Sequence, residues 1–404
     1  MKKILVVFTG GTIGSTAAEG TINTSSEAPF KLIQQFQQHC NNHQQIHFST
    51  IQPLQILSEN LAPCVWQTLI TAIETQQPDQ YDGIIITHGT DTLAYTAAAL
   101  SFYFNAIKIP MLLVSSDYPL DDTRANGLEN FMCAVEFILQ NIQAGIFVPY
   151  RNQQQTPQVH RGSRLVSSLQ LSGDFFSVQG KSFMQFENRQ FSLLNPSTKS
   201  ILGKNSNKLP HLLERVGERR KKSTRYIPLI PARSTLLRAG FSLKGEGAGT
   251  CVDTNALESN AGAVGRTQTK NPHLKANFSE RILMIKPYPG LNYANFNLEN
   301  VDAVLHDLYH SGTACASTQW GENYSLLVFI RRCLEQNKKA YLAPAIKSDN
   351  AYQSTRALIE QGAKMIWNMS IEAAYVKLML AYGNFSDEQQ IMEFIDMDIA
   401  GEHV

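Results

Sequence analysis

The stretch Ile4-Leu-Val-Val-Phe-Thr-Gly-Gly-Thr-Ile-Gly14 joins a short apolar run directly to a glycine-rich turn. Consecutive apolar residues, several of them β-branched, are typical of a strand that is buried on both faces of a parallel sheet. Glycine lets the backbone bend sharply and lets another group approach closely, so the Thr12 hydroxyl can point into the space beyond the strand. Alone, the pattern also fits a glycine turn in a nucleotide-binding sheet, and it therefore predicts a sheet edge without its chemistry.

A second stretch, Gly83-Ile-Ile-Ile-Thr-His-Gly-Thr-Asp-Thr92, repeats this arrangement, with a buried strand expected over Gly83–Thr87 as a neighbour of the first. It runs into an alanine-rich helix expected over Leu93–Phe104. In open α/β sheets, ligands bind at the carboxyl ends of the strands. The two turns together therefore place Thr12, Thr90 and Asp91 around one crevice. A structural alternative is that the aspartate, or the threonine after it, only caps the helix that follows.

Short apolar runs alternate with helical patterns outward from these turns, which predicts an α/β protein with crossover helices. We expect a larger N-terminal domain with a doubly wound, mainly parallel sheet over residues 1–202 and a smaller C-terminal α/β domain over residues 280–404. Residues 203–279 lack periodicity and are interpreted as a linker or insertion. The last helix is expected over Glu388–Ile399.

Composition indicates a globular protein, with 43% hydrophobic and 17% charged residues among 404. The formal net charge of +1 provides no field that would attract nucleic acid, and the basic run Arg219–Lys222 is interpreted as a solvated cluster. The cysteines stand singly, which predicts reduced thiols and no metal site. They are Cys40, Cys64, Cys133, Cys251, Cys315 and Cys333.

The first apolar run, Ile4–Phe8, is shorter than the ~7–15 apolar residues of a signal peptide. No other run approaches the ~20 apolar residues that cross a bilayer. We therefore expect a cytoplasmic protein that binds a small molecule and neither nucleic acid nor membrane.

Further segments carry a resemblance to a known family. Asp91–Phe102, Tyr118–Arg124, Arg161–Arg164 and Glu372–Leu378, together with the two turns, resemble the L-asparaginases, specifically the cytoplasmic type I branch. The resemblance covers nearly the whole chain except Gly203–Ser279. It implies the bacterial-type asparaginase fold, an amino-acid amide as substrate, no cofactor, and a homodimer or homotetramer.

The resemblance also implies roles for residues. Thr12 matches the nucleophile that attacks the side-chain amide carbonyl, after which ammonia leaves and water hydrolyses the acyl-enzyme. Thr90 and Asp91 match a second catalytic set, and Asp91 also pairs with the α-ammonium of the substrate. The remaining positions match substrate-binding ones: Ser58 and Glu59 at the amino-acid end, and Gly11 and Gly89 through the glycine turns.

Three positions depart from the family pattern. Thr21 stands where the family has a tyrosine, Ser167 where it has a lysine, and Cys315 where it has an asparagine from the neighbouring subunit. Loss of one member of a concerted catalytic set commonly costs orders of magnitude in rate. Lys181 is the only lysine that we consider a chemically plausible substitute, and its position in the sequence disfavours it.

Three functions are therefore weighed. The first is hydrolysis of L-asparagine to L-aspartate and ammonia. The second is binding of an amino acid or a partner with little or no turnover, which the missing tyrosine and lysine favour. The third is amide hydrolysis on a larger substrate, such as a peptide, or as the glutaminase part of a transfer-RNA amidotransferase.

Overall fold

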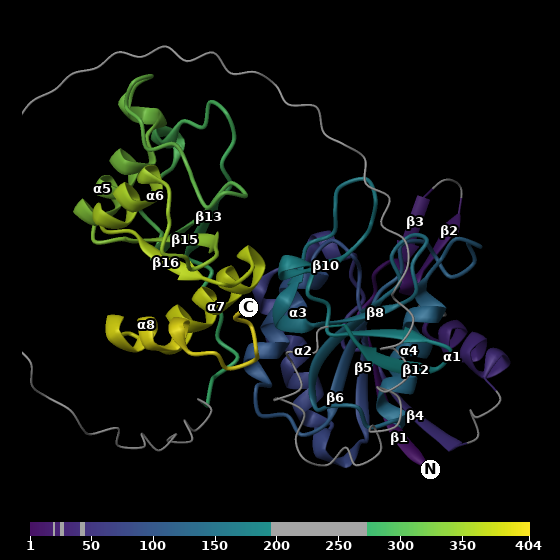
Figure 1. Cartoon of the computed structure of the whole chain (residues 1–404). Helices are drawn as coiled ribbons and strands as arrows, with labels where there is room; N and C mark the ends of the chain where they lie inside the picture. The colour runs from purple at the N-terminus through teal and green to yellow at the C-terminus, as the bar shows by residue number, and fades with distance from the viewer. Residues whose placement is uncertain (19–20, 25–27, 41–44, 195–272) are drawn as a thin grey trace, which may run out of the picture. The chain divides into compact units, whose positions relative to one another are not determined.

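The computed structural model describes residues 1–18, 21–24, 28–40, 45–194 and 273–404 (Figure 1). The expected insertion over residues 203–279, including Arg219–Lys222, therefore lies almost entirely outside the described residues. The strand expected at Ile4–Phe8 is observed as β1 (Lys2–Phe8), and the second expected strand is β5 (Gly83–Thr87).

These two strands lie side by side in an eight-stranded sheet with the order β12-β11-β8-β7-β6-β5-β1-β4. Five neighbouring strands are parallel to one another, and in sheet order they are β7, β6, β5, β1 and β4. At the other edge, β8, β11 and β12 each pair antiparallel with the strand before them in the sheet. The mainly parallel sheet is therefore confirmed. The other strands are β4 (Ile46–Ile51), β6 (Pro110–Val114), β7 (Gly145–Tyr150), β8 (Gln158–Arg161), β11 (Met184–Glu187) and β12 (Gln190–Leu193).

Helices cover both faces of this sheet because its central strands are apolar on both sides. Leu5 and Val7 of β1 pack in one core with α2 (Pro63–Thr75) and α3 (Leu93–Tyr103). Ile4 and Val6 face the opposite way and pack in a second core with two further helices. Figure 1 shows this doubly wound arrangement, in which the second pair is α1 (Ala28–His39) and α4 (Gly127–Leu139).

A smaller sheet follows in the C-terminal part, with the order β13-β14-β15-β16 and all strands parallel. This confirms the second, smaller α/β unit of the fold. Its strands are β13 (Ile282–Ile285), β14 (Ala303–Asp307), β15 (Lys339–Ala345) and β16 (Lys364–Trp367). Its helices are α5 (Leu326–Glu335), α6 (Gln353–Glu360), α7 (Ile371–Asn384) and α8 (Glu388–Asp396).

Two short antiparallel pairs complete the described structure. β2 (Ser15–Ala18) and β3 (Thr21–Thr24) form a hairpin directly after the first glycine turn. β9 (Leu165–Val166) pairs with β10 (Phe176–Ser177). Both pairs lie close to candidate site residues in the sequence.

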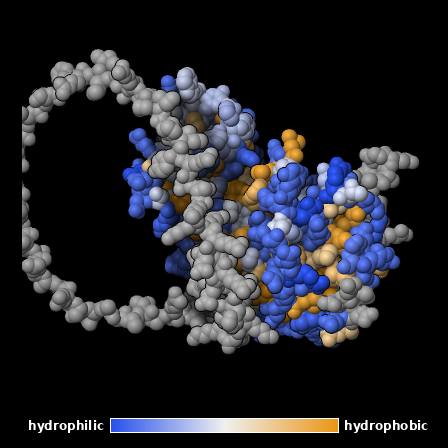
Figure 2. Space-filling model, turned by 45° about the vertical axis from the view of Figure 1, so that its right-hand side comes forward, coloured by the Kyte–Doolittle hydropathy of each residue, from blue (hydrophilic) through white to orange (hydrophobic). Residues whose placement is uncertain are grey.

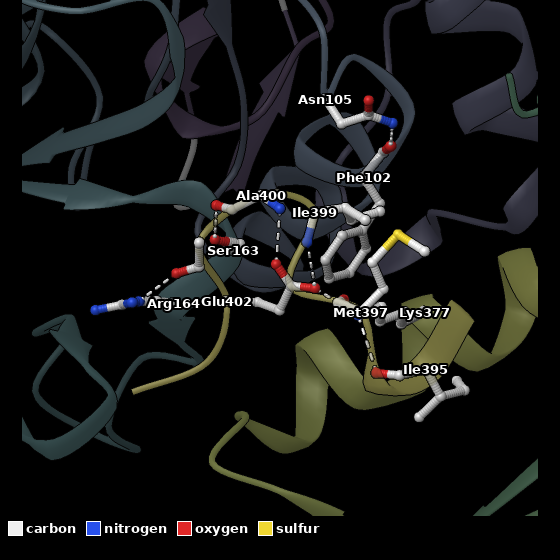
Figure 3. A network of polar contacts seen from close by, with 11 residues as sticks. Phe102, Asn105, Ser163, Arg164, Lys377, Ile395, Met397, Ile399, Ala400 and Glu402 are labelled. Atoms are coloured by element: carbon white, nitrogen blue, oxygen red, sulfur yellow. Dashed lines mark hydrogen bonds and ion pairs between the residues drawn. The ribbon is translucent and has the colours of Figure 1, made fainter. Parts of the chain in front are cut away.

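The end of the last helix differs from the expectation, because α8 stops at Asp396 rather than at Ile399. The ammonium group of Lys377 donates hydrogen bonds to the carbonyl groups of Ile395 and Met397 (Figure 3). These carbonyls are thereby satisfied without a further helical turn. The chain then turns so that the Glu402 carboxylate reaches the same ammonium.

None of the described helices combines the length and the hydrophobicity needed to cross a lipid bilayer. On the face drawn in Figure 2, hydrophilic residues predominate and hydrophobic ones form small separate patches. The large apolar side chains of the central strands are instead buried in the cores described above.

Candidate active site

The two glycine turns begin at the same edge of the large sheet. β1 pairs with β5 in parallel register, and the last pair is Phe8 with Thr87. The hydroxyl of Thr9 donates a hydrogen bond of 2.6 Å to the carbonyl oxygen of Thr87. The sequence therefore predicted correctly that these two strands are neighbours and that both turns start at one edge.

The backbones of the two turns are in direct contact. Gly11 has a φ of 76°, and a Cβ atom on it would lie 2.3 Å from the amide nitrogen of Gly89. Any side chain at Gly11 would therefore push the turns apart. Thr12 and Thr90, which follow these glycines directly, are both half-buried.

A third segment, the loop before α2, holds the first turn in place. The amide of Gly11 donates a hydrogen bond to the carbonyl oxygen of Ile56 at 2.9 Å. The amide of Ile56 in turn donates to the carbonyl oxygen of Thr9, also at 2.9 Å. Because the Gly11 amide is bonded within the protein, the contribution of this glycine to the site is its backbone shape.

Ser58, in the same loop, connects to the second turn. Its hydroxyl donates to the Asp91 carboxylate at 3.1 Å and accepts from the Asp91 amide at 3.2 Å. The hydroxyl of Thr92 donates to the Ser58 carbonyl oxygen at 3.0 Å. Ser58 is buried, whereas Asp91 and Glu59, the residue after Ser58, are exposed.

The structural alternative for this turn was that Asp91 or Thr92 caps α3. Thr92 occupies the N-cap position of α3, but its side chain makes no capping hydrogen bond. Both side chains bond to Ser58 instead. The capping interpretation is therefore wrong, and the polar groups of this turn are directed toward the loop that contains Ser58.

His88 is a buried residue of this turn to which the sequence reasoning gave no role. Its Nδ1 atom lies 2.8 Å from the carbonyl oxygen of Gly89, and burial lowers the pKa of the imidazole. A neutral ring in this position holds the Gly89 carbonyl and adds no positive charge beside Asp91.

The exposed carboxylates of the site are not paired with any cationic side chain in the part of the chain that the structure describes. Among the residues that the structure describes, neither Asp91 nor Glu59 takes part in an ion pair. One oxygen of Asp91 already accepts from Ser58. Such carboxylates are suited to binding a cationic group of a ligand.

The positions that depart from the family pattern lie in three different places. Thr21 is in β3, where its backbone pairs with that of Ala18. Ser167 follows β9, is half-buried, and donates its amide to Glu372 Oε1 at 2.8 Å. Lys181, the substitute considered for the missing lysine, is exposed.

Cys315 is exposed and lines a cavity of about 390 Å³ in the C-terminal part of the chain. Half of the residues that line it are aromatic, and they are Tyr288, Tyr293, Tyr309, Trp320 and Tyr324. The structure does not bring Cys315 into contact with the residues of the two turns.

Residues 3–198 match the family model described as "Asparaginase, N-terminal". A glutamyl-tRNA(Gln) amidotransferase component from Methanococcus maripaludis is 24% identical over 360 residues, which span 86% of this chain and 68% of that protein. L-asparaginase 1 of Escherichia coli is 36% identical over 135 residues, which span 33% of this chain and 39% of that protein.

Solved structures show the same fold. The thermostable L-asparaginase of Thermococcus kodakarensis superimposes with a TM-score of 0.67 at 21% identity, covering 100% of this chain and 99% of that one. L-asparaginase I of Vibrio cholerae gives the same TM-score, identity and coverage. A probable cytoplasmic L-asparaginase of Campylobacter jejuni gives a TM-score of 0.63 at 17% identity.

Proposed function

Since this chain belongs to the asparaginase family, we propose that it is an amidohydrolase that converts L-asparagine to L-aspartate and ammonia, with Thr12 as nucleophile. The observation that carries the proposal is the contact between the Gly11 and Gly89 backbones. It holds the hydroxyl-bearing residues of two turns at one sheet edge, where open α/β sheets bind their ligands.

In the proposed reaction, the Thr12 hydroxyl attacks the side-chain amide carbonyl and transfers its proton through Thr90 and Asp91 to the leaving ammonia. Water then hydrolyses the acyl-enzyme and releases L-aspartate. Gly89 lines the substrate site beside Gly11. The reaction uses side chains and water, and it requires no cofactor.

The α-amino-acid end of the substrate is assigned to the Ser58 loop. Asp91 has one oxygen on the Ser58 hydroxyl, and its exposed carboxylate would pair with the α-ammonium group. Glu59, which follows Ser58 in the chain, adds a second exposed carboxylate. This arrangement favours a free amino acid with an unblocked ammonium group over an internal peptide residue.

The test is ammonia release from millimolar L-asparagine by the purified chain. We expect turnover that Thr12→Ala abolishes, whereas Thr68→Ala, on the exposed face of α2, leaves the rate unchanged. Ser167→Lys is expected to increase the rate, because it restores a positive charge at a position where the family has lysine. Turnover that survives in Thr12→Ala would exclude Thr12 as the nucleophile.

A second candidate is a homologue that binds an amino acid or a partner with little or no turnover. Thr21 and Ser167 favour it, because both stand where the family has a catalytic side chain. Binding of L-asparagine without ammonia release in the wild type, together with activity in Ser167→Lys, would support this candidate over the first.

A third candidate follows from the names of the relatives, several of which are components of a glutamyl-tRNA(Gln) amidotransferase. It predicts faster ammonia release from L-glutamine than from L-asparagine. A preference for L-asparagine in the same assay would support the first candidate instead.

We further propose a homodimer or homotetramer in the cytoplasm. This rests on the resemblance to the type I asparaginases. Sedimentation of the purified chain tests the assembly, and a monomer at all concentrations would contradict it.

A further inference from the structure

Glu372, in the first turn of α7, is a buried carboxylate with one oxygen unused. The side chain is only 3% exposed, and its Oε1 atom accepts the amide of Ser167 at 2.8 Å. The Oε2 atom has no hydrogen-bond partner among the described residues. A buried polar atom without a partner costs free energy, and a charged one costs more, so this oxygen indicates a missing partner.

Other oxygen-bearing side chains surround this carboxylate. Burial raises the pKa of the Tyr95 phenol to about 12, and the negative charge of Glu372 is the second cause of the rise. A hydrogen bond with the Ser167 hydroxyl lowers the pKa of the same phenol in part. The ring of Tyr95 packs edge-on against that of Tyr375, with their centres 6.1 Å apart. The segment after β9 is joined to α7 by the bond from the Ser167 amide to Glu372, and α3 is joined to the same first part of α7 by the contact of Tyr95 with Tyr375, three residues after Glu372.

The charge around Glu372 is negative. Burial is the main cause that raises the pKa of the Asp307 carboxyl, and the negative charge of Glu372 raises this pKa further. Lys286 acts on Asp307 but is exposed to solvent. Within the described part of the chain, Glu372 forms no ion pair.

We propose that the Glu372 Oε2 atom, the Ser167 hydroxyl and the Tyr95 phenol form a binding site for a small monovalent cation, ammonium or K⁺. These donors are all oxygens, which suit a hard cation or a group that donates hydrogen bonds. One close carboxylate supplies one negative charge. No set of three or more potential metal-binding side chains occurs among the described residues, which disfavours a divalent ion.

The position of this site gives the cation a consequence for the reaction. Tyr95 lies in the first turn of α3, four residues after Asp91 in the sequence, and Ser167 occupies the position where the family has lysine. A bound cation would therefore restore a positive charge that the chain's own sequence lacks there. The binding inference itself rests on Glu372 and its neighbours and does not depend on the proposed hydrolysis.

The test measures thermal unfolding of the full chain in ammonium, potassium or tetramethylammonium chloride at equal ionic strength. We expect ammonium and potassium to raise the Tm on the order of 1–3 °C above tetramethylammonium, which is too large for the site. Glu372→Gln should lose this difference, and the matched control Glu360→Gln, which is exposed on α6, should keep it. Equal Tm values in the three salts for the wild type would overturn the proposal.

A second variant covers the case in which Glu372→Gln does not fold. Ser167→Lys places a tethered ammonium group near Glu372, so it should raise the Tm in tetramethylammonium and remove the response to ammonium and potassium. A response that persists in Ser167→Lys would place the cation elsewhere and overturn the proposal. Thr12→Ala should keep the full response, which separates cation binding from any failure of the proposed hydrolysis.

Discussion

Gly89 shows how little space the candidate site leaves at single residues. A Cβ atom on Gly89 would lie 2.4 Å from Ser58 Oγ and 2.7 Å from Ser58 Cβ, well inside normal contact distances. The same hydroxyl holds the Asp91 carboxylate. The packing around Ser58 and the position of the Asp91 carboxylate therefore both depend on the absence of a side chain at Gly89.

We predict that Gly89→Ala lowers the free energy of unfolding by about 1–3 kcal/mol through overpacking and weakens substrate binding by displacing Ser58. Gly14→Ala is the matched control, since a Cβ atom there meets nothing within 4 Å. Urea denaturation and asparagine binding measure the two effects. Equal stability of the two variants would show that the Ser58 loop moves away without cost.

His160 illustrates a residue whose burial affects stability through pH. Its Nδ1 atom lies 2.9 Å from Ser177 Oγ, and its Nε2 atom has no partner in the described part of the chain. Burial lowers the pKa of the imidazole to about 4. Because the folded pKa is below the unfolded value of about 6.5, protonation favours the unfolded state. The stabilisation that the neutral ring provides is lost as the pH falls from about 6.5 toward 4.

Between pH 7 and pH 5, the free energy of unfolding should fall by about 2 kcal/mol more in the wild type than in His160→Gln, because glutamine cannot titrate. Asp398 acts in the opposite direction, because burial raises its pKa to about 6 and its neutral form favours folding. The difference between variant and wild type cancels that contribution. His47→Gln, at an exposed position, is the control, and parallel Tm–pH curves for His160→Gln and the wild type would contradict the prediction.

The sequence predicted that Thr12, Thr90 and Asp91 lie in turns at one sheet edge, because both turns follow buried strands and strand patterns are local signals. It assigned Ser58 only through the family resemblance, since the bond to Asp91 joins residues 33 positions apart. Glu372 had no local signal as a buried carboxylate. Its burial depends on the packing of α7 against the Ser167 segment, which periodicity does not encode.

At the scale of elements, α7 begins with a capping residue that also sets the position of Glu372. The Ser370 hydroxyl accepts the amide of Ala373 at 3.1 Å, and Glu372 lies within that first turn. The cap therefore fixes the backbone from which the carboxylate reaches Ser167.

We predict that Ser370→Ala costs about 1 kcal/mol and weakens the cation-dependent rise in Tm. Asp387 is the equivalent cap of α8, because its carboxylate accepts a hydrogen bond from the Gln390 amide at 3.0 Å. The control variant Asp387→Ala removes this cap. That control should lose similar stability yet keep the cation response. A response unchanged in both variants would show that Glu372 is held without the cap.

Elements were predicted best where the pattern was continuous and worst where a long-range contact ended them. The second buried strand was predicted with its observed bounds, because five buried residues occupy Gly83–Thr87. The helix expected to reach Ile399 stops at Asp396 instead. At that end the ammonium of Lys377, a residue of another helix, binds the carbonyls of Ile395 and Met397, and no pattern within α8 reports these bonds.

At the scale of the whole described chain, the C-terminal tail connects α7 and α8 to the region around β8 and β9. The hydroxyl of Ser163 donates to the Ala400 carbonyl oxygen at 2.9 Å (Figure 3). The Arg164 guanidinium donates to the carbonyls of Gly401 and His403. These bonds join residues more than 230 positions apart, which local sequence patterns cannot predict.

The centre of this network is the ion pair of Lys377 and Glu402, both with fully buried side chains. Besides the ammonium of Lys377, the Glu402 carboxylate accepts the amides of Ile399 and Ala400 at 3.2 and 2.8 Å. Burial lowers the pKa of Lys377, and the nearby Glu402 acts against that shift. Such a pair is costly to desolvate, so its removal must be considered one partner at a time.

We predict that Lys377→Met destabilises the chain by about 3–5 kcal/mol, because it leaves the Glu402 charge buried and two carbonyls, of Ile395 and Met397, without their donor. Glu402→Gln should cost less, since glutamine retains an acceptor for the tail amides and the remaining lysine can lose its proton. Urea denaturation measures both. If Glu402→Gln proved the more destabilising, the charge of the pair, rather than its hydrogen bonds to the backbone, would hold the tail in place.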